Sequence, residues 1–304
     1  MLRFDDQNKD AYLEPLKPMT REPLPLTDEE FHVLSKMIYD HTGILIKPSK
    51  KYLLESRLSE RLNALGCENY RDYIFYLKRD DIHQEFQKLI NVITNNETRF
   101  LRNFPQLKDF QTKLLPELVE RNQAERRKLK IWCAGCSTGE EPYSLAMLIS
   151  ERFPSVVMGR QVEIIGSDIN TEVIKIARKG VYTNSQLKHL APQYLSRFFR
   201  QVDQGYEVTA MIKSVVRFEL INLFDQYTVK RVIQQTDVIF FRNVMIYFGE
   251  EKRRQVISLM YDVLRPGGYL FLGHSESLHG ISKAFKIRSL GKSLVYYKEN
   301  LGLP

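Results

Sequence analysis

The sequence predicts an α/β protein whose core is a doubly wound, Rossmann-like parallel sheet, preceded by a smaller all-α domain. Three stretches predict the sheet. Residues 131–134 form a short apolar run, which is followed by small residues and then by an apolar helix through 149. Residues 162–168 form a second strand that ends in an acid, and 238–241 are apolar throughout, as a strand covered on both faces would be. Strands that alternate with helices in this way are typical of open parallel sheets.

Length and composition limit the possible classes of protein. The 304 residues, with 43% hydrophobic content, can bury a sizeable core and form two domains. No apolar segment approaches the roughly 20 residues of a membrane span, and the N-terminus lacks a signal-peptide pattern. We therefore expect a cytoplasmic monomer that does not insert into membranes. The 3 cysteines give no disulfide framework, and no metal site is predicted.

The net charge of +8 does not by itself predict a nucleic-acid partner. The 45 basic residues are interspersed with 37 acidic ones and form no continuous basic run. We therefore predict no nucleic-acid binding, and an acidic protein partner accounts for the excess charge equally well.

The chain is expected to begin with a flexible arm, 1–26, and an all-α domain, 27–92. The arm is polar and proline-bearing and lacks periodicity. Thr27-Asp-Glu-Glu30 then forms a capping box, and amphipathic helices follow. This domain contains no catalytic constellation, so we expect it to recognise a partner.

One helix of that domain, about 49–65, is predicted to choose the substrate. Its leucines form an apolar stripe for the domain's own core. The basic residues between them are expected to project outward: Lys50, Lys51, Arg57 and Arg61. Glutamates on the same helix partly compensate their charge, so a merely solvated face is the alternative.

Residues 93–104 connect the two domains and are expected to contribute to a ligand site. The stretch Thr94-Asn-Asn-Glu-Thr-Arg-Phe-Leu-Arg102 has more hydrogen-bonding side chains than a plain linker needs. Asn103 and Pro105 then begin the first helix of the second domain, 105–304.

The loop after the first strand predicts a nucleoside-type ligand. The small residues of 135–139 let a ligand approach the backbone and the first turn of the next helix. That turn carries Glu140 and Glu141 and no basic residue, which suits ribose hydroxyls or a sulfonium better than a pyrophosphate. Capping of the helix dipole is the alternative role for these carboxylates.

Asp168 ends the second strand, at the place where a βαβ unit binds a ribose diol. Capping of the next helix is the alternative, but beside the first loop the ribose site is the better interpretation. Other strands also end in polar residues, namely Asn222, Arg242-Asn243 and His274-Ser-Glu-Ser277. In an open α/β sheet the carboxyl edge of the strands is where ligands bind.

A dithiol redox site is a rival interpretation of the first loop. Trp132-Cys133-Ala-Gly-Cys136 has the spacing of such a site, with a strand before it and a helix after it. The redox geometry requires the first cysteine at a helix start, whereas this helix is expected to begin after Gly139. Small packing residues at a strand end are therefore the preferred interpretation.

Two antiparallel features are expected within the second domain. Residues about 198–220 predict a small inserted β-subdomain, and 285–297 predict an antiparallel hairpin at the sheet edge.

Together these motifs resemble the chemotaxis receptor methyltransferases, the CheR family of protein-glutamate O-methyltransferases. The resemblance runs from about Leu26 to the C-terminus, and as a set its motifs are highly specific. They are Thr94-x-Asn96-x-Thr98-x-x-x-Arg102, Ser137-Thr-Gly-Glu-Glu-Pro-Tyr-Ser144, Ser167-Asp-Ile169, Asn222-Leu223, Arg242-Asn-Val-Met-Ile-Tyr-Phe248 and Gly273-His-Ser-Glu276.

The resemblance implies that S-adenosylmethionine is the cofactor and S-adenosylhomocysteine its product. It implies that methyl-accepting chemotaxis receptors, through their cytoplasmic helical region, are the partners. It also implies a set of cofactor-binding residues: Asn96, Thr98, Arg102, Glu141, Asp168, Asn222, Leu223, Arg242 and Asn243. Of the two loop carboxylates, Glu141 matches the family's ligand position better than Glu140.

The chemistry of such a reaction predicts the catalytic residues. A glutamate side chain, with a pKa of about 4.3, is already ionised at pH 7 and can attack a sulfonium methyl without a general base. The enzyme has to desolvate and align it. Arg102 is expected to hold this carboxylate bidentately, and Tyr247 to orient it by a hydrogen bond.

Two other classes of function stay open. A methyltransferase for nucleic acids or small molecules would need a base-stacking pocket or a general base, and the sequence indicates neither. A binding module that senses S-adenosylmethionine without turnover would not need Arg102 and Tyr247, which are both present.

Overall fold

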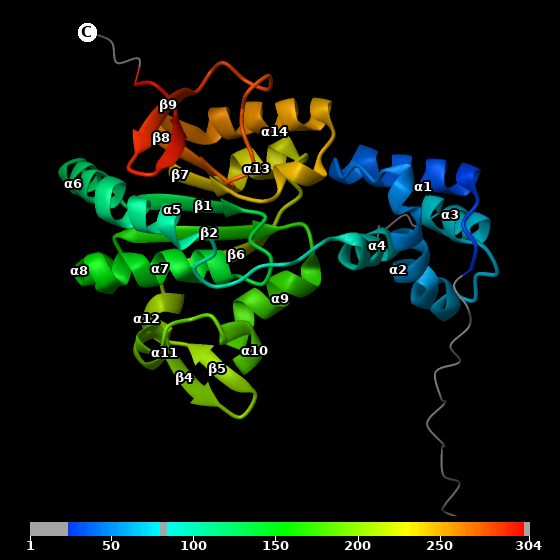
Figure 1. Ribbon diagram of the computed structural model, residues 1–304, viewed down its shortest axis with the longest axis horizontal. Coiled ribbons are helices and arrows are strands. Elements are labelled where there is room, and N and C mark those ends of the chain that lie inside the picture. Colours follow the sequence, from blue (N-terminus) through cyan, green and yellow to red (C-terminus); the bar gives the residue numbers. More distant parts are fainter. Residues whose placement is uncertain (1–23, 80–83, 301–304) are drawn as a thin grey trace, which may run out of the picture.

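The computed structural model describes residues 24–79 and 84–300. A helical domain lies beside a larger α/β domain, at the end of the sheet to which the strands point (Figure 1). Most of the expected arm, 1–23, lies outside the described residues. Its last residues pack on the helical domain, where Leu26 is buried and its backbone N–H donates to Glu55 (3.0 Å).

Four helices form the predicted all-α domain: α1 (Asp28–Thr42), α2 (Lys51–Ala64), α3 (Tyr70–Lys78) and α4 (Gln84–Ile93). The capping box of Thr27 and Glu30 is confirmed at the start of α1. Gly43 ends this helix at φ +70°, a left-handed conformation that glycine adopts without strain. Leu54, Leu58 and Leu62 of α2 lie in the domain's own core, as expected, whereas Leu53 is half-buried and does not belong to it.

The linker leads into a helical stretch that precedes the sheet. It consists of α5 (Phe104–Asp109), a π-helical turn (Phe110–Leu114) and α6 (Leu115–Ala124). The chain then enters the first strand, β1 (Leu129–Ala134).

Seven strands form the main sheet in the order β6-β2-β1-β7-β8-β10-β9. The other strands are β2 (Val162–Asp168), β6 (Val216–Leu220), β7 (Thr236–Phe241), β8 (Leu264–Leu272), β9 (Lys286–Leu290) and β10 (Ser293–Tyr297). β2, β1, β7 and β8 pair in parallel, and β6 pairs in parallel with β2. β10 is antiparallel to both of its neighbours, which confirms the expected edge hairpin.

The strands bury both faces of the sheet, because successive side chains point to opposite sides. On β1, Leu129, Ile131 and Cys133 belong to one hydrophobic core, and Trp132 and Ala134 belong to the other. β7 alternates in the same way and is buried along its whole length, so its predicted central position is confirmed.

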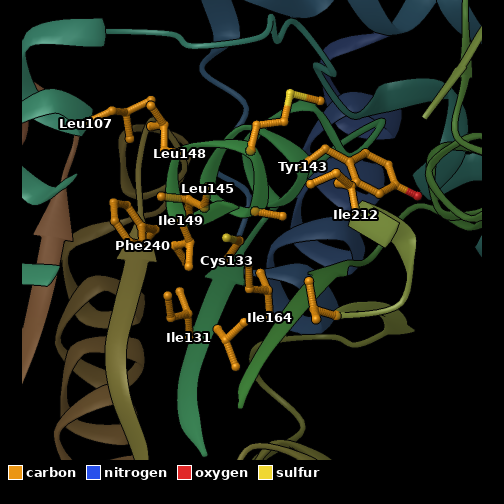
Figure 2. Close-up of a cluster of buried hydrophobic side chains, with 14 of the residues drawn as sticks. Leu107, Ile131, Cys133, Tyr143, Leu145, Leu148, Ile149, Ile164, Ile212 and Phe240 are labelled. Carbon is orange, nitrogen blue, oxygen red and sulfur yellow. The ribbon is translucent and has the colours of Figure 1, made fainter. Parts of the chain in front are cut away.

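Helices cover these two faces. α7 (Glu140–Arg152) packs on the first face beside α6, and α8 (Pro154–Met158) and α9 (Thr171–Lys179) continue that layer. Figure 2 shows Leu145 and Ile149 of α7 over Ile131 and Cys133 of β1. α13 (Gln226–Val232) and α14 (Glu250–Val263) cover the second face. The helices on both sides make the sheet doubly wound. In the described residues, no helix combines the length and the apolar character of a membrane span.

A small antiparallel sheet is inserted between α9 and β6. Its strands lie in the order β3 (Val181–Tyr182), β5 (Gly205–Val208) and β4 (Phe199–Val202), with α10 (Asn184–Leu187), α11 (Pro192–Phe198) and α12 (Ala210–Lys213) around them. The expected range of this subdomain, about 198–220, has to be corrected. Its first strand is at 181–182, and 216–220 belong to the main sheet, where β6 pairs with β2.

Candidate active site

The candidate site lies where the order of the strands reverses. The chain runs from β1 outward through β2 to β6, and then returns to the other side of β1 with β7 and β8. In such sheets, ligands bind outside the carboxyl ends of the two strands at the reversal. A cavity of about 300 Å³ lies at this position, lined by the loops after β1, β2, β6 and β7, the linker and the helical domain.

The loop after β1 crosses closely over the tip of β7. Gly135 has φ +77°, and a β-carbon there would lie 2.4 Å from the side chain of Val244. The N–H groups of Gly135 and Cys136 both donate to the carbonyl of Ser167. This position therefore requires glycine, and the loop is fixed to both neighbouring strands.

Asp168 is held by the same loop. Its carboxylate accepts the backbone N–H groups of Ser137 (2.9 Å) and Asn170 (3.0 Å). Burial raises its pKa above the usual value, and these backbone hydrogen bonds partly offset that shift. Because a carboxylate can accept more than two hydrogen bonds, Asp168 retains capacity for ligand hydroxyls at the cavity that it lines.

The two loop carboxylates, Glu140 and Glu141, have different surroundings. Glu140 is buried and accepts a hydrogen bond from Thr138 (2.7 Å), whereas Glu141 lines the cavity and pairs with Arg242 (2.7 Å). Burial raises the pKa of Glu141, and the charge of Arg242 opposes that shift. The geometry supports Glu141 over Glu140 as the ligand contact.

Arg242 connects this carboxylate with the linker. Its side chain is only 2% exposed, and it donates to Glu141 and to the backbone carbonyl of Arg102 (2.6 Å). Its guanidinium is thus engaged by the protein, so it positions two predicted site residues. These two hydrogen bonds leave the Arg242 side chain little capacity to contact the ligand directly.

The linker lies along the cavity. The hydroxyl of Ser137 donates to the carbonyl of Asn96 (2.8 Å), which ties the linker to the first loop. The guanidinium of Arg102 donates to the carbonyl of Glu97 (3.0 Å), and both Thr98 and Arg102 line the cavity. Its remaining donors are available to a ligand, since a guanidinium carries five N–H groups.

The helical domain covers the other side of the cavity. The side-chain amide of Asn222 donates to the carbonyl of His41 (2.8 Å), and the N–H of Leu45 donates to the carbonyl of Tyr247 (2.9 Å). The hydroxyl of Tyr247 accepts from Asn95 (2.9 Å), so its own hydrogen can be donated elsewhere. The remaining predicted residues, Leu223 and Asn243, also line the cavity.

The expectation that the four basic residues project outward is wrong for three of them, whereas Lys50, just before α2, is exposed. Arg61 pairs with the buried Glu85, Lys51 pairs with Asp28 (2.7 Å), and Arg57 donates to the carbonyl of Ile93 (2.6 Å) at the end of α4. Helix ends and buried carboxylates attract cations, and this outweighs solvation here. Of the four residues, Lys50 and Arg57 line the cavity.

The dithiol interpretation does not fit the structure. Cys133 and Cys136 are both buried free thiols, and α7 begins only at Glu140. Burial raises the pKa of each thiol well above its usual value, whereas a redox cysteine needs a lowered pKa.

We expect the double variant Cys133→Ser, Cys136→Ser to bind ligand and turn over, at some cost in stability because two polar hydroxyls replace buried thiols. Ligand calorimetry, an activity assay and the Tm are the measurements. Loss of turnover with ligand affinity and fold intact would contradict this assignment.

Glu276 belongs to a motif noted in the sequence, but no role was predicted for it. Its carboxylate accepts the backbone N–H groups of Asn243 (2.7 Å) and Gly273 (2.8 Å). It thereby connects the tips of β7 and β8 and holds Asn243 at φ +61°, a strained conformation for a residue with a side chain. Two residues separate Glu276 from Gly273, and this short loop was the signal in the sequence that could have identified the contact.

The variant Glu276→Ala is expected to weaken cofactor binding by about tenfold, because both N–H groups lose the one acceptor oxygen that they share. The neighbouring exposed His274→Ala is the matched control and should bind like the wild type. Calorimetric titration measures both. Equal affinities in the two variants would show that Asn243 needs no such support.

The arrangement brings charges of both signs to one cavity, from the strand tips, the linker and the helical domain. Carboxylates at the strand tips can accept hydrogen bonds from hydroxyls, and cations on the linker and α2 can hold an anion. No histidine is among the described lining residues. Within the described ranges, no group of acidic, histidine or cysteine side chains could hold a metal ion.

Two protein-family comparisons match this architecture. Residues 29–94 match the family described as "CheR methyltransferase, all-alpha domain", and 96–293 match "CheR methyltransferase, SAM binding domain". The donor set fits S-adenosylmethionine, since Asp168 and Glu141 suit hydroxyl or ammonium groups and no phosphate-binding lysine is needed.

Curated relatives give the same result over most of the chain. "Chemotaxis protein methyltransferase 2" of Vibrio cholerae is 36% identical over 278 residues, which cover 91% of this chain and 95% of that protein. "Chemotaxis protein methyltransferase" of Escherichia coli is 36% identical over 275 residues, covering 88% and 91%. The corresponding protein of Borreliella burgdorferi is 35% identical over 258 residues, covering 84% and 90%. The chain therefore belongs to the CheR family of S-adenosylmethionine-dependent chemotaxis protein methyltransferases.

Proposed function

We propose that this protein methylates glutamate side chains in the cytoplasmic helical region of chemotaxis receptors. The products are glutamate methyl esters and S-adenosylhomocysteine, and the enzyme acts in the cytoplasm for adaptation of the signal. The observation that carries the proposal is that cations from outside the sheet, Arg102, Arg57 and Lys50, line the same cavity as the strand-tip carboxylates. These cations suit an acceptor that is itself an anion.

The cations that line the cavity support a carboxylate acceptor. When bound, S-adenosylmethionine supplies an electrophilic methyl group on a sulfonium. An alcohol or amine acceptor would have to lose a proton to a base, whereas a glutamate carboxylate is already ionised at neutral pH. The chain therefore has to position the carboxylate and exclude water, and needs no proton transfer.

Arg102 and Tyr247 are the residues that would position the acceptor. Arg102 has donors left after its bond to Glu97, and its backbone is fixed by Arg242. Tyr247 accepts from Asn95 and can therefore donate its hydroxyl hydrogen to a carboxylate oxygen. Two donors from different elements would fix the direction of the reacting oxygen.

Methyl transfer to receptor fragments from S-adenosylmethionine with a radiolabelled methyl group tests the proposal. We expect label on the receptor that alkali releases as volatile methanol, because carboxyl methyl esters are base-labile. Alkali-stable label would mean a different acceptor. If the protein binds the cofactor but transfers no methyl group, under conditions in which an active receptor methyltransferase labels the same fragments, a sensing module would be favoured.

Among the four predicted basic residues, Lys50, which directly precedes α2, is the most suited to meet the substrate. It is exposed, lines the cavity and has no carboxylate partner among the described residues. The substitution Lys50→Glu is expected to raise the KM for receptor about tenfold and to flatten its salt dependence, because it reverses a long-range attraction. Lys51→Glu is the matched control, since Lys51 does not line the cavity. Equal KM values for the two variants would make this end of α2 a solvated surface.

A further inference from the structure

A second cavity, of about 440 Å³, lies at the amino end of the sheet. It lies between the ends of α6 and α8, where the chain turns into β1 and β2. In Figure 1 these helix ends are at the far end of the sheet from the helical domain, and so from the reaction cavity. A ligand bound there would not compete with the methylation site.

The lining combines an apolar floor with an amide and basic rim. Three buried side chains form the floor: Val119, Leu129 and Val156. The rim carries three amides, Asn122, Gln123 and Gln161, and four cations, Arg126, Arg127, Lys128 and Arg160. No acidic residue is among the described lining residues.

One of the four cations is part of the scaffold. Arg127 pairs with Asp237 (2.6 Å), a residue with 0% exposure that also accepts from Arg121 (3.2 Å) and from the backbone N–H of Lys130 (2.8 Å). Arg127 further contacts Asn122 in the cavity wall. A buried network of this kind keeps the wall rigid before any ligand arrives.

The other three cations are not matched by a carboxylate. Arg126, Lys128 and Arg160 are exposed, and no ion pair of theirs is present in residues 24–79 and 84–300. They converge from two loops on one concavity. Cations that line one concavity raise the local positive potential, which favours binding of an anion there.

Two of these arginines occupy strained backbone positions. Arg126 has φ +50° and Arg160 has φ +49°, each at the turn from a helix into a strand. Glycine adopts this conformation without strain, and it is the common residue after a helix end. Gln235, at φ +48° before β7, occupies the same kind of turn but does not line the cavity.

We propose that this cavity binds a small organic phosphate of about the size of a nucleotide. Arginines bind phosphate bidentately, which accounts for the guanidinium groups at the rim. The apolar floor and the amides suit a planar polar ring better than a bare inorganic ion. The volume lies in the range of small-molecule sites, whereas an acidic protein segment would need an extended groove.

Calorimetric titration of the full chain tests the proposal, with S-adenosylhomocysteine saturating the reaction cavity so that adenine compounds cannot bind there. The probes are ADP, GDP and pyrophosphate at about 0.15 M salt, where surface charges are screened beyond about 8 Å. At least one nucleotide is expected to bind with 1:1 stoichiometry and about tenfold or more tighter than pyrophosphate, because the ring adds apolar burial.

Variants separate charge from backbone strain. Arg126→Gly with Arg160→Gly should weaken nucleotide binding at least about tenfold, while the Tm of the ligand-free protein rises because strain is removed. Gln235→Gly is the matched control: its Tm should rise and its affinity should stay at the wild-type value. Lys128→Ala should weaken binding without any change of backbone.

Three results would overturn the proposal. They are the absence of binding by all three probes at millimolar concentration, pyrophosphate affinity equal to that of the nucleotides, and wild-type affinity in the double glycine variant. The second result would indicate a plain anion site. The third would leave the arginines with no role beyond complementing the helix dipoles.

Discussion

Replacing Arg102 by methionine is expected to lower kcat for methyl transfer by about 10²-fold, the usual cost when a reacting group is no longer held in line. Methionine keeps much of the volume and loses the charge and the fork of donors. The backbone of Arg102 should stay in place, because Arg242 holds its carbonyl (2.6 Å). Arg102→Lys should recover only part of the rate, since an ammonium cannot bind a carboxylate bidentately.

Two measurements distinguish positioning of the acceptor from binding of the cofactor. The affinity for S-adenosylhomocysteine should fall by less than about tenfold in Arg102→Met, because the carboxylates at the strand tips remain. Arg99→Met is the matched control, since Arg99 is exposed, lies on the same segment and also lines the cavity. A loss that appears only in cofactor affinity, or an equal loss in Arg99→Met, would contradict the role proposed for Arg102.

Removing the charge of Asp168 or Glu141 should weaken cofactor binding by about 1–3 kcal/mol each, the cost of a charged hydrogen bond, which is about 5- to 150-fold in Kd. Glu140→Gln is the matched control, because Glu140 is buried against Thr138 and does not line the cavity. Unchanged affinity in both Asp168→Asn and Glu141→Gln would remove this edge of the sheet as the cofactor site.

The same carboxylates predict a pH dependence. Burial raises the pKa of Asp168 in the ligand-free protein, whereas hydroxyl groups bind the ionised form. Affinity should therefore be constant above that raised pKa and fall as the pH decreases through it. In the Asp168→Asn variant, the affinity should no longer fall over this pH range, because the titrating carboxyl group is absent. Trp132, the 1 tryptophan of the chain, can report binding because its indole donates to Ser167 (2.9 Å), next to Asp168.

The sheet and its ligand-binding edge could be predicted from local pattern. Uninterrupted apolar runs such as 238–241 favour strands buried on both faces, and the structure confirms that β7 is central. Parallel strands bring their carboxyl ends to one edge, so residues that follow different strands converge. The positions of Glu141, Asp168, Asn222 and Arg242 around one cavity follow from that rule.

The direction of individual side chains could not be predicted in this way. Glu140 and Glu141 are neighbours in sequence, but successive residues of a helix point about 100° apart, so the packing of α7 decides which one faces the cavity. In the sequence, the four cations Lys50, Lys51, Arg57 and Arg61 look equivalent, as members of one basic helix face. Their partners, Asp28, Glu85 and the carbonyl end of α4, come from other helices.

Thus the sequence by itself determined the fold class, the edge of the sheet that binds ligand and the residues gathered there. Only the tertiary structure decided which of these residues face a ligand and which are engaged by the protein, as Arg242 is by Glu141 and Glu276 is by the tips of β7 and β8. The physical reason is the distance along the sequence over which each kind of interaction acts. Hydrophobic periodicity and strand direction act along a few consecutive residues, whereas hydrogen bonds and ion pairs join residues that are distant in sequence and meet only after the core has packed.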